Sequence, residues 1–193
     1  FTGLLLTVLK GQIILEIVKS LIDYDSKHTK ILDFGKLLPN GKSFFTQIKE
    51  PKADSSNSFE LKTTVPYLLF LLEKGVDANQ PDLFGVYPLQ HAIQNKYFHF
   101  VLTLLTSGTL DFSVKITAQH VINGTYLHLA AYTSVEIIKE LKSLNVFDLD
   151  STDDLGHTPY QVAKIVHPDA YPTSFGALPN SILYYLQSST ETV

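Results

Sequence analysis

The sequence predicts an all-α fold in which polar turns separate pairs of short helices. Gly75 follows an apolar stretch where a helix must end, and a glycine takes the left-handed conformation of a helix C-cap at little steric cost. Pro88 stands where the next helix begins, since its fixed φ and missing N–H are harmless in a first turn. Between them lie turn formers that bond their own backbone, at Asp77, Asn79 and Asp82. This order predicts a helix, a turn and a second helix.

Composition restricts the class of protein. The 193 residues are 45% hydrophobic, enough to bury a core, and the formal net charge of -4 gives no electrostatic support for a nucleic-acid partner. The absence of cysteine excludes disulfides and thiolate chemistry within the chain and weakly favours a reducing compartment. No apolar run approaches the ~20 residues of a membrane-spanning helix. We therefore expect no nucleic-acid partner and no membrane span.

The first part of the chain carries the weaker helix signals. An amphipathic helix is predicted from apolar residues that recur at helical spacing, namely Ile14, Ile17, Val18, Leu21 and Ile22. Residues 49–63 are mostly polar and offer little to bury. We interpret this segment as a solvated, mobile insertion.

Helices recur along the rest of the chain. Apolar residues predict one over residues 98–105, which ends before Gly108, and an amphipathic one over residues 135–141. Residues 110–122 alternate apolar side chains at Phe112, Val114 and Ile116, and form either an extended hairpin or a short helix. A further helix is predicted after Pro159. Three later prolines break any helix, and a last helix over residues 180–186 is expected to cap the fold.

The turn and helix signals together resemble the ankyrin repeat, whose pattern runs Gly-x-Thr-Pro-Leu-His-x-Ala after an Asn-containing turn. The resemblance is carried by Gly75, Asn79, Gly85, Pro88, Gly124, Thr125, His128, Gly156, Thr158 and Pro159. It implies a solenoid of four to five stacked helix-turn-helix repeats, all within one domain over residues 1–193. The expected units are a partial repeat at 1–39, a degenerate repeat at 40–80 with the insertion at 49–63, repeats at 81–114 and 115–152, and a last repeat with its cap at 153–193.

One repeat departs from the family pattern at two positions. Tyr87 stands where the family has Thr, and Gln90 stands where it has His. In the family those side chains bond loop backbone, so this loop must be secured differently or be looser. The Thr and His are present at Thr125 and His128, and the resemblance implies a structural role for His128.

The resemblance also implies a function, namely non-catalytic binding of another protein through loop tips and the concave face of the stack. Aromatic and apolar side chains at such positions suit interface anchors. The candidates are Leu83, Phe84, Val86, Tyr87, Gln90, Tyr126, Tyr132, Leu155, His157 and Tyr160. The alternative for Tyr87, Tyr126 and Tyr160 is that they pack between repeats. No cofactor or metal is expected, and the partner protein stays unidentified.

A second hypothesis makes the chain the targeting arm of a larger enzyme, or of a secreted effector, with its catalytic part elsewhere. The chain is similar to ankyrin modules of bacterial effectors, which would place it inside a host cell; otherwise a cytoplasmic location is expected. Asn79, with Leu71 eight positions earlier and Asp77 two before it, is similar to ankyrin asparagines that are hydroxylated in animal cells. The alternative is that Asn79 only stabilises its turn.

Motifs for catalysis are incomplete. Residues 35–43 resemble a phosphate-binding P-loop, but five residues rather than four separate the glycines, and Pro39 lacks an N–H donor. Nucleotide binding through Lys42 and Ser43 is therefore a third, weaker hypothesis. The seven histidines form no His-Glu-x-x-His motif, and no Gly-x-Ser-x-Gly turn is present. We expect the chain not to be an enzyme.

Overall fold

The computed structural model describes residues 20, 23–25, 27–28, 36–48, 58–166 and 186. The chain divides into two compact units, one made of residues 1–88 and 102–110 and the other of residues 89–101 and 111–193. Several predictions lie outside the described residues: most of the partial first repeat, the first part of the insertion at 49–57, and nearly all of the C-terminal cap.

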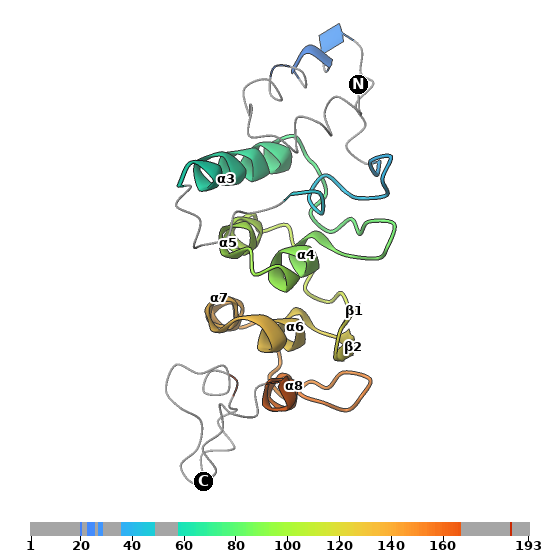
Figure 1. Ribbon diagram of the computed structural model, residues 1–193, viewed down its shortest axis with the longest axis vertical. Helices are drawn as coiled ribbons and strands as arrows, with labels where there is room; N and C mark the ends of the chain where they lie inside the picture. The colour runs from blue at the N-terminus through green and yellow to red at the C-terminus, as the bar shows by residue number, and fades with distance from the viewer. Residues whose placement is uncertain are drawn as a thin grey trace. The chain divides into compact units, whose positions relative to one another are not determined.

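The first unit is built around helix α3, Ser58–Glu73 (Figure 1). The predicted insertion at 49–63 is therefore wrong from Ser58 onward, where the chain is already helical. Gly75 ends the helix as predicted: its φ is +78°, its N–H donates to Leu72 O (3.0 Å), and the Val76 N–H donates to Leu71 O (3.1 Å). These two bonds form a Schellman cap. The unit's core includes Phe45, Leu68, Leu71, Val76 and Leu104.

Two short helices follow α3 in the chain. Helix α4, Pro88–Gln94, begins at the proline as predicted, and helix α5, Phe98–Thr106, matches the predicted apolar helix. Lys96, in the turn between them, has a φ of +59°. Gly108, with φ +68°, follows α5 where the sequence predicted its end.

The second unit adds a hairpin and three helices, which Figure 1 shows grouped around α6. Helix α6, Tyr126–Thr133, packs against helix α7, Val135–Ser143, against helix α8, Pro159–Val166, and against strand β2. Side chains at the centre of this packing are fully buried, among them Leu127, Ala130, Ile138, Leu141 and Ala163. Pro159 opens α8 as predicted.

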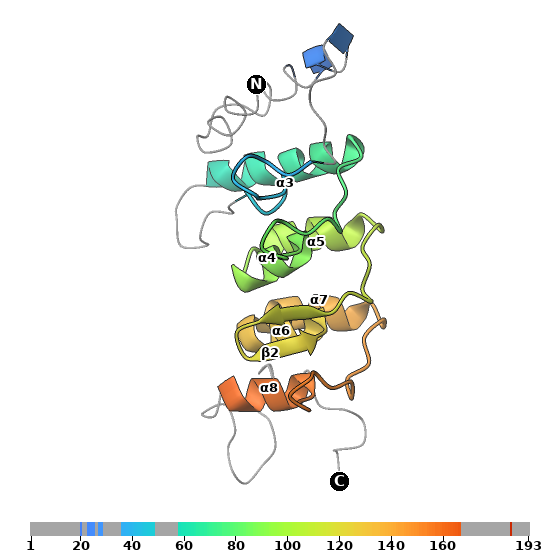
Figure 2. The same cartoon turned by 90° about the vertical axis from the view of Figure 1, so that its right-hand side faces the viewer.

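The prediction of an all-α solenoid is wrong, because the described residues contain a small antiparallel sheet as well as helices. Strands β1, Ile116–Ala118, and β2, Val121–Gly124, pair in Figure 2 as a hairpin, and the fold is mixed α/β. The physical reason is an alternating pattern: Ile116 is buried while Lys115 and Thr117 are exposed, which suits a strand with one covered face. Of the two forms left open for residues 110–122, the structure has the hairpin.

The hairpin is irregular at two places. His120, in its two-residue turn, has a φ of +63°. Ala118 pairs with Val121 and Ile116 with Gly124, so β2 contains one extra residue, and Asn123 in this bulge has a φ of +53°. A bulge of this kind redirects the neighbouring side chains.

Candidate partner-binding loops

Two turns of the chain carry the same hydrogen bonds around an aspartate. In the first unit, Asp82 Oδ1 accepts from the N–H groups of Phe84 (2.9 Å) and Val86 (3.0 Å). In the second unit, Asp153 Oδ1 accepts from the N–H groups of Leu155 (3.0 Å) and His157 (2.9 Å). A carboxylate that accepts two backbone N–H groups holds a short turn firmly, because such charge-assisted bonds are stronger than neutral ones. Each turn therefore presents its tip residues on a fixed backbone.

Backbone bonds close both turns in the same way. The Asp82 N–H donates to Val86 O and the Asp153 N–H donates to His157 O, each at 3.0 Å. Gly85 (φ +75°) and Gly156 (φ +78°) occupy the left-handed position that the turn requires. The segment from Leu38 to Lys42 repeats this closure, with Leu38 N–H to Lys42 O at 2.8 Å, although it lacks the aspartate.

Neighbouring loops are joined within each unit. In the first, the Leu83 N–H donates to Gly41 O (2.7 Å). In the second, the Asp154 N–H donates to Ile122 O (2.8 Å), and Asn123 Nδ2 donates to Asp154 Oδ2 (2.5 Å). The loop tips are therefore not independent, since each is tied to the loop beside it.

Gln90, which stands where the ankyrin pattern has His, makes a long-range hydrogen bond. Gln90 Nε2 donates to Thr117 O (3.0 Å) on the hairpin, and His128 Nε2 lies 3.0 Å from His157 O on the next loop. Gln90 thus bridges to the following loop in the same way as His128. The loop of Asp82 is secured by the aspartate, whose Oδ1 accepts from the N–H groups of Phe84 and Val86.

Neutral His128 has a defined tautomer in this arrangement. Its Nδ1 accepts from the Thr125 N–H (3.1 Å), so Nε2 carries the proton and donates to His157 O. Burial lowers the pKa of His128, and the His157 carbonyl and Asp153 oppose this shift without cancelling it. Thr125 is the N-cap of α6 and His128 its third residue, so the pair forms a capping box. The structural role that the resemblance implied for His128 agrees with these bonds.

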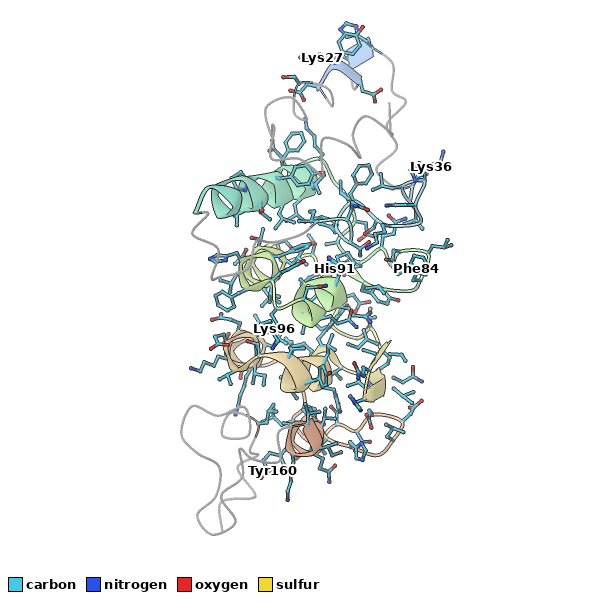
Figure 3. The ribbon with its side chains drawn as sticks, in the orientation of Figure 1. Lys27, Lys36, Phe84, His91, Lys96 and Tyr160 are labelled. Atoms are coloured by element: carbon cyan, nitrogen blue, oxygen red, sulfur yellow. The ribbon has the colours of Figure 1, made fainter. Side chains whose placement is uncertain are left out.

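The predicted partner-binding residues fall into three groups. Leu83 and Phe84 are each 72% exposed, and Leu155 is 49% exposed. Figure 3 shows Phe84 at the outer end of the loop that joins α3 and α4. Val86, Tyr87, Tyr132 and His157 are half-buried. Gln90, Tyr126 and Tyr160 are buried, so only the first two groups offer side chains to a partner.

Sequence reasoning missed Ile122, which is 41% exposed on β2. The Asp154–Ile122 bond places it on the loop next to the one that carries Leu155. Its alternation with buried Val121 was the available signal, but it could be used only if the segment was already known to be a strand.

Asn79 holds two parts of the first unit together. Its N–H donates to Asp77 Oδ1 (2.8 Å), and its Nδ2 donates to Thr109 O (2.8 Å), thirty positions further along the chain. These contacts agree with the interpretation that Asn79 stabilises the turn. Hydroxylation of Asn79 stays a prediction.

The residues of the P-loop-like segment take part in local structure. The Ser43 N–H donates to Thr46 Oγ1 (3.0 Å), the Thr46 N–H donates to Ser43 Oγ (3.1 Å), and Ser43 is buried. Lys42 Nζ lies 3.5 Å from Thr46 O. Ser43 is thus occupied by a capping arrangement rather than directed at a ligand.

Among the described residues, His, Asp and Glu side chains nowhere form a group of three that could hold a metal ion. Each helix that the structure describes is too short or too polar to cross a lipid bilayer. No protein-family model matches the chain, and no curated protein matches its sequence.

Proposed function

We propose that the chain is a non-catalytic module that binds a partner protein through the exposed apolar side chains of its loop tips. The observation that carries this proposal is the exposure of Leu83 and Phe84, 72% each, on a turn that Asp82 holds rigid. Two adjacent large apolar side chains thus lie largely in water, where they gain little from the hydrophobic effect. Buried against a partner, they would supply favourable apolar area.

The rigidity of the turn adds to the case. Ordering a flexible loop opposes binding, and a loop already held in its bound form avoids that entropic cost. The Asp82 carboxylate, the left-handed Gly85 and the Leu83–Gly41 bond all restrict this loop before any partner arrives. In the second unit, Ile122 and Leu155 present a smaller apolar pair on tied loops.

Membership of the ankyrin-repeat family is part of the proposal. It is supported by the two Asp-x-x-Gly turns with matching bonds, each followed by a helix that begins at a proline. Gln90, Tyr126 and Tyr160 are buried, so their side chains are excluded from the proposed surface.

The experiment compares capture of a partner by the unmodified chain and by two variants. Proteins that the unmodified chain retains from a lysate are identified by mass spectrometry and compared with those that Phe84→Ala retains. Leu69→Ala is the control, because Leu69 is also exposed (51%) in the first unit but lies on α3. Loss of an interface anchor weakens binding by about 2 kcal/mol or more, roughly thirtyfold.

We expect the partner to be lost with Phe84→Ala and kept with Leu69→Ala. Both variants should unfold at the same urea concentration as the unmodified chain, since each changes an exposed side chain. Equal recovery by all three folded proteins would remove the loop tip from the proposed interface.

A further inference from the structure

Asn123 is followed by Gly124, and this pair lies at the bulge of the hairpin. An asparagine before glycine is chemically labile, because the next backbone nitrogen can attack the side-chain carbonyl carbon and a glycine has no Cβ to obstruct the approach. Asn123 is exposed, with a φ of +53° in the left-handed region that asparagine tolerates. The chain has a second such pair, Asn40–Gly41, which serves as an internal comparison.

We propose that Asn123 is a site of spontaneous deamidation, and that its conversion separates the two loops it now joins. The Gly124 nitrogen forms a bond to Asn123 Cγ and gives its proton to solvent. The bond from Cγ to Nδ2 breaks, and Nδ2 takes a proton from water and leaves as ammonia. Water then opens the ring to aspartate or isoaspartate, so the balance is one water consumed and one ammonia released.

The structural consequence follows from what the Asn123 amide does. Its Nδ2 donates to Asp154 Oδ2, beside the backbone bond from the Asp154 N–H to Ile122 O. Conversion replaces the donor by a carboxylate that faces the Asp154 carboxylate, and like charges at this distance repel. Isoaspartate also lengthens the backbone by a methylene at the bulge. Both products weaken the contact between residues 121–124 and 153–157.

Asn40 has more hydrogen bonds on its side-chain amide than Asn123, whose Nδ2 is bonded to Asp154. Its Nδ2 donates to Gln47 Oε1 (2.6 Å), its Oδ1 accepts from the Lys42 N–H (3.2 Å), and the Gly41 N–H donates to Leu38 O (2.8 Å). Both ends of the Asn40 amide are thus bonded, which restrains the carbon that would be attacked. We expect Asn40 to react severalfold more slowly than Asn123 in the folded protein.

The first test follows the reaction itself. Folded protein and urea-unfolded protein are incubated at mildly alkaline pH, and the peptides around Asn123 and Asn40 are assayed over time for mass gain and isoaspartate. Conversion of Asn123 ahead of Asn40 in the folded protein is the expected result. In Asp154→Ala, which frees the Asn123 amide, the Asn123 rate should rise severalfold and the Asn40 rate should not change. If Asn123 stays unmodified in the folded protein over the time in which it is converted in the unfolded chain, the proposal is wrong.

The second test follows the loop contact. Hydrogen exchange of the Asp154 amide should be severalfold faster in Asn123→Asp, because the bond to Ile122 O opens more often. Asn40→Asp is the matched control and should leave this amide protected. Unchanged protection in Asn123→Asp would refute the separation of the loops. Neither measurement uses a partner, so this inference and the proposed function can fail independently.

Discussion

Replacing Gly41 by alanine tests whether the loop that carries Leu83 packs against the loop that carries Gly41. Gly41 has a φ of +77°, in the left-handed region. A Cβ added there would lie 2.9 Å from Leu83 Cβ and 3.0 Å from Leu83 Cδ2. The Leu83 N–H is bonded to Gly41 O at 2.7 Å, so Leu83 cannot move away without loss of that bond.

The expected cost has two parts. The left-handed conformation costs an alanine about 1–2 kcal/mol. Forcing a methyl group into an occupied position costs roughly 1–3 kcal/mol more. The smaller entropy of the unfolded alanine chain offsets about 0.4–1 kcal/mol. The free energy of unfolding should therefore fall by about 1–5 kcal/mol.

Gly85→Ala is the matched control. Its φ of +75° is nearly the same, but no atom lies within 4 Å of the added Cβ. It should cost only the backbone part, about 1 kcal/mol after the entropic offset. The difference between the two variants therefore isolates the contact with Leu83.

Urea unfolding measures both variants through their midpoints and slopes. A midpoint for Gly41→Ala clearly below that of Gly85→Ala, with equal slopes, is the expected result. Leu83→Ala should restore only part of the stability that Gly41→Ala loses. The Leu83 substitution removes Cδ2 but keeps the Cβ at 2.9 Å. Equal urea midpoints for the two glycine variants would refute the packing of Leu83 against Gly41.

Two further predictions concern buried polar groups. Because burial lowers the pKa of His128 below the value of about 6.5 for an unfolded histidine, the unfolded chain takes up the proton first as pH falls. Its contribution to stability should be complete above about pH 6.5 and be lost as pH drops through the folded pKa, at no more than about 1.4 kcal/mol per pH unit. His128→Gln, whose amide can bridge as Gln90 does, should remove this part of the pH dependence in urea titrations, and an unchanged pH profile would count against it. Asp82→Ala should cost more stability than Asp153→Ala, by about 1–3 kcal/mol, since Asp153 Oδ2 is buried without a partner and its removal relieves a desolvation penalty. Unfolding curves that rank the two variants the other way would contradict this reasoning.

The sequence by itself determined the local features of this protein. The helix stop at Gly75, the helix starts at Pro88 and Pro159, and the turn residues between them were all predictable. Their hydrogen bonds join groups within about five positions of one another, so residue type and spacing are enough to specify them. The exposure of Leu83, Phe84 and Leu155 follows for the same reason, because they occupy the tips of those turns.

Only the tertiary structure decided which distant segments meet. Residues 110–122 were compatible with a helix or a hairpin, and the hairpin is joined to distant parts of its unit by bonds from Gln90 to Thr117 and from Asp154 to Ile122. The burial of Tyr126 and Tyr160 and the bond from Asn79 to Thr109 likewise depend on contacts between remote residues. A side chain's own neighbourhood in sequence does not encode its long-range partner, since that partner is selected by the packing of the whole unit.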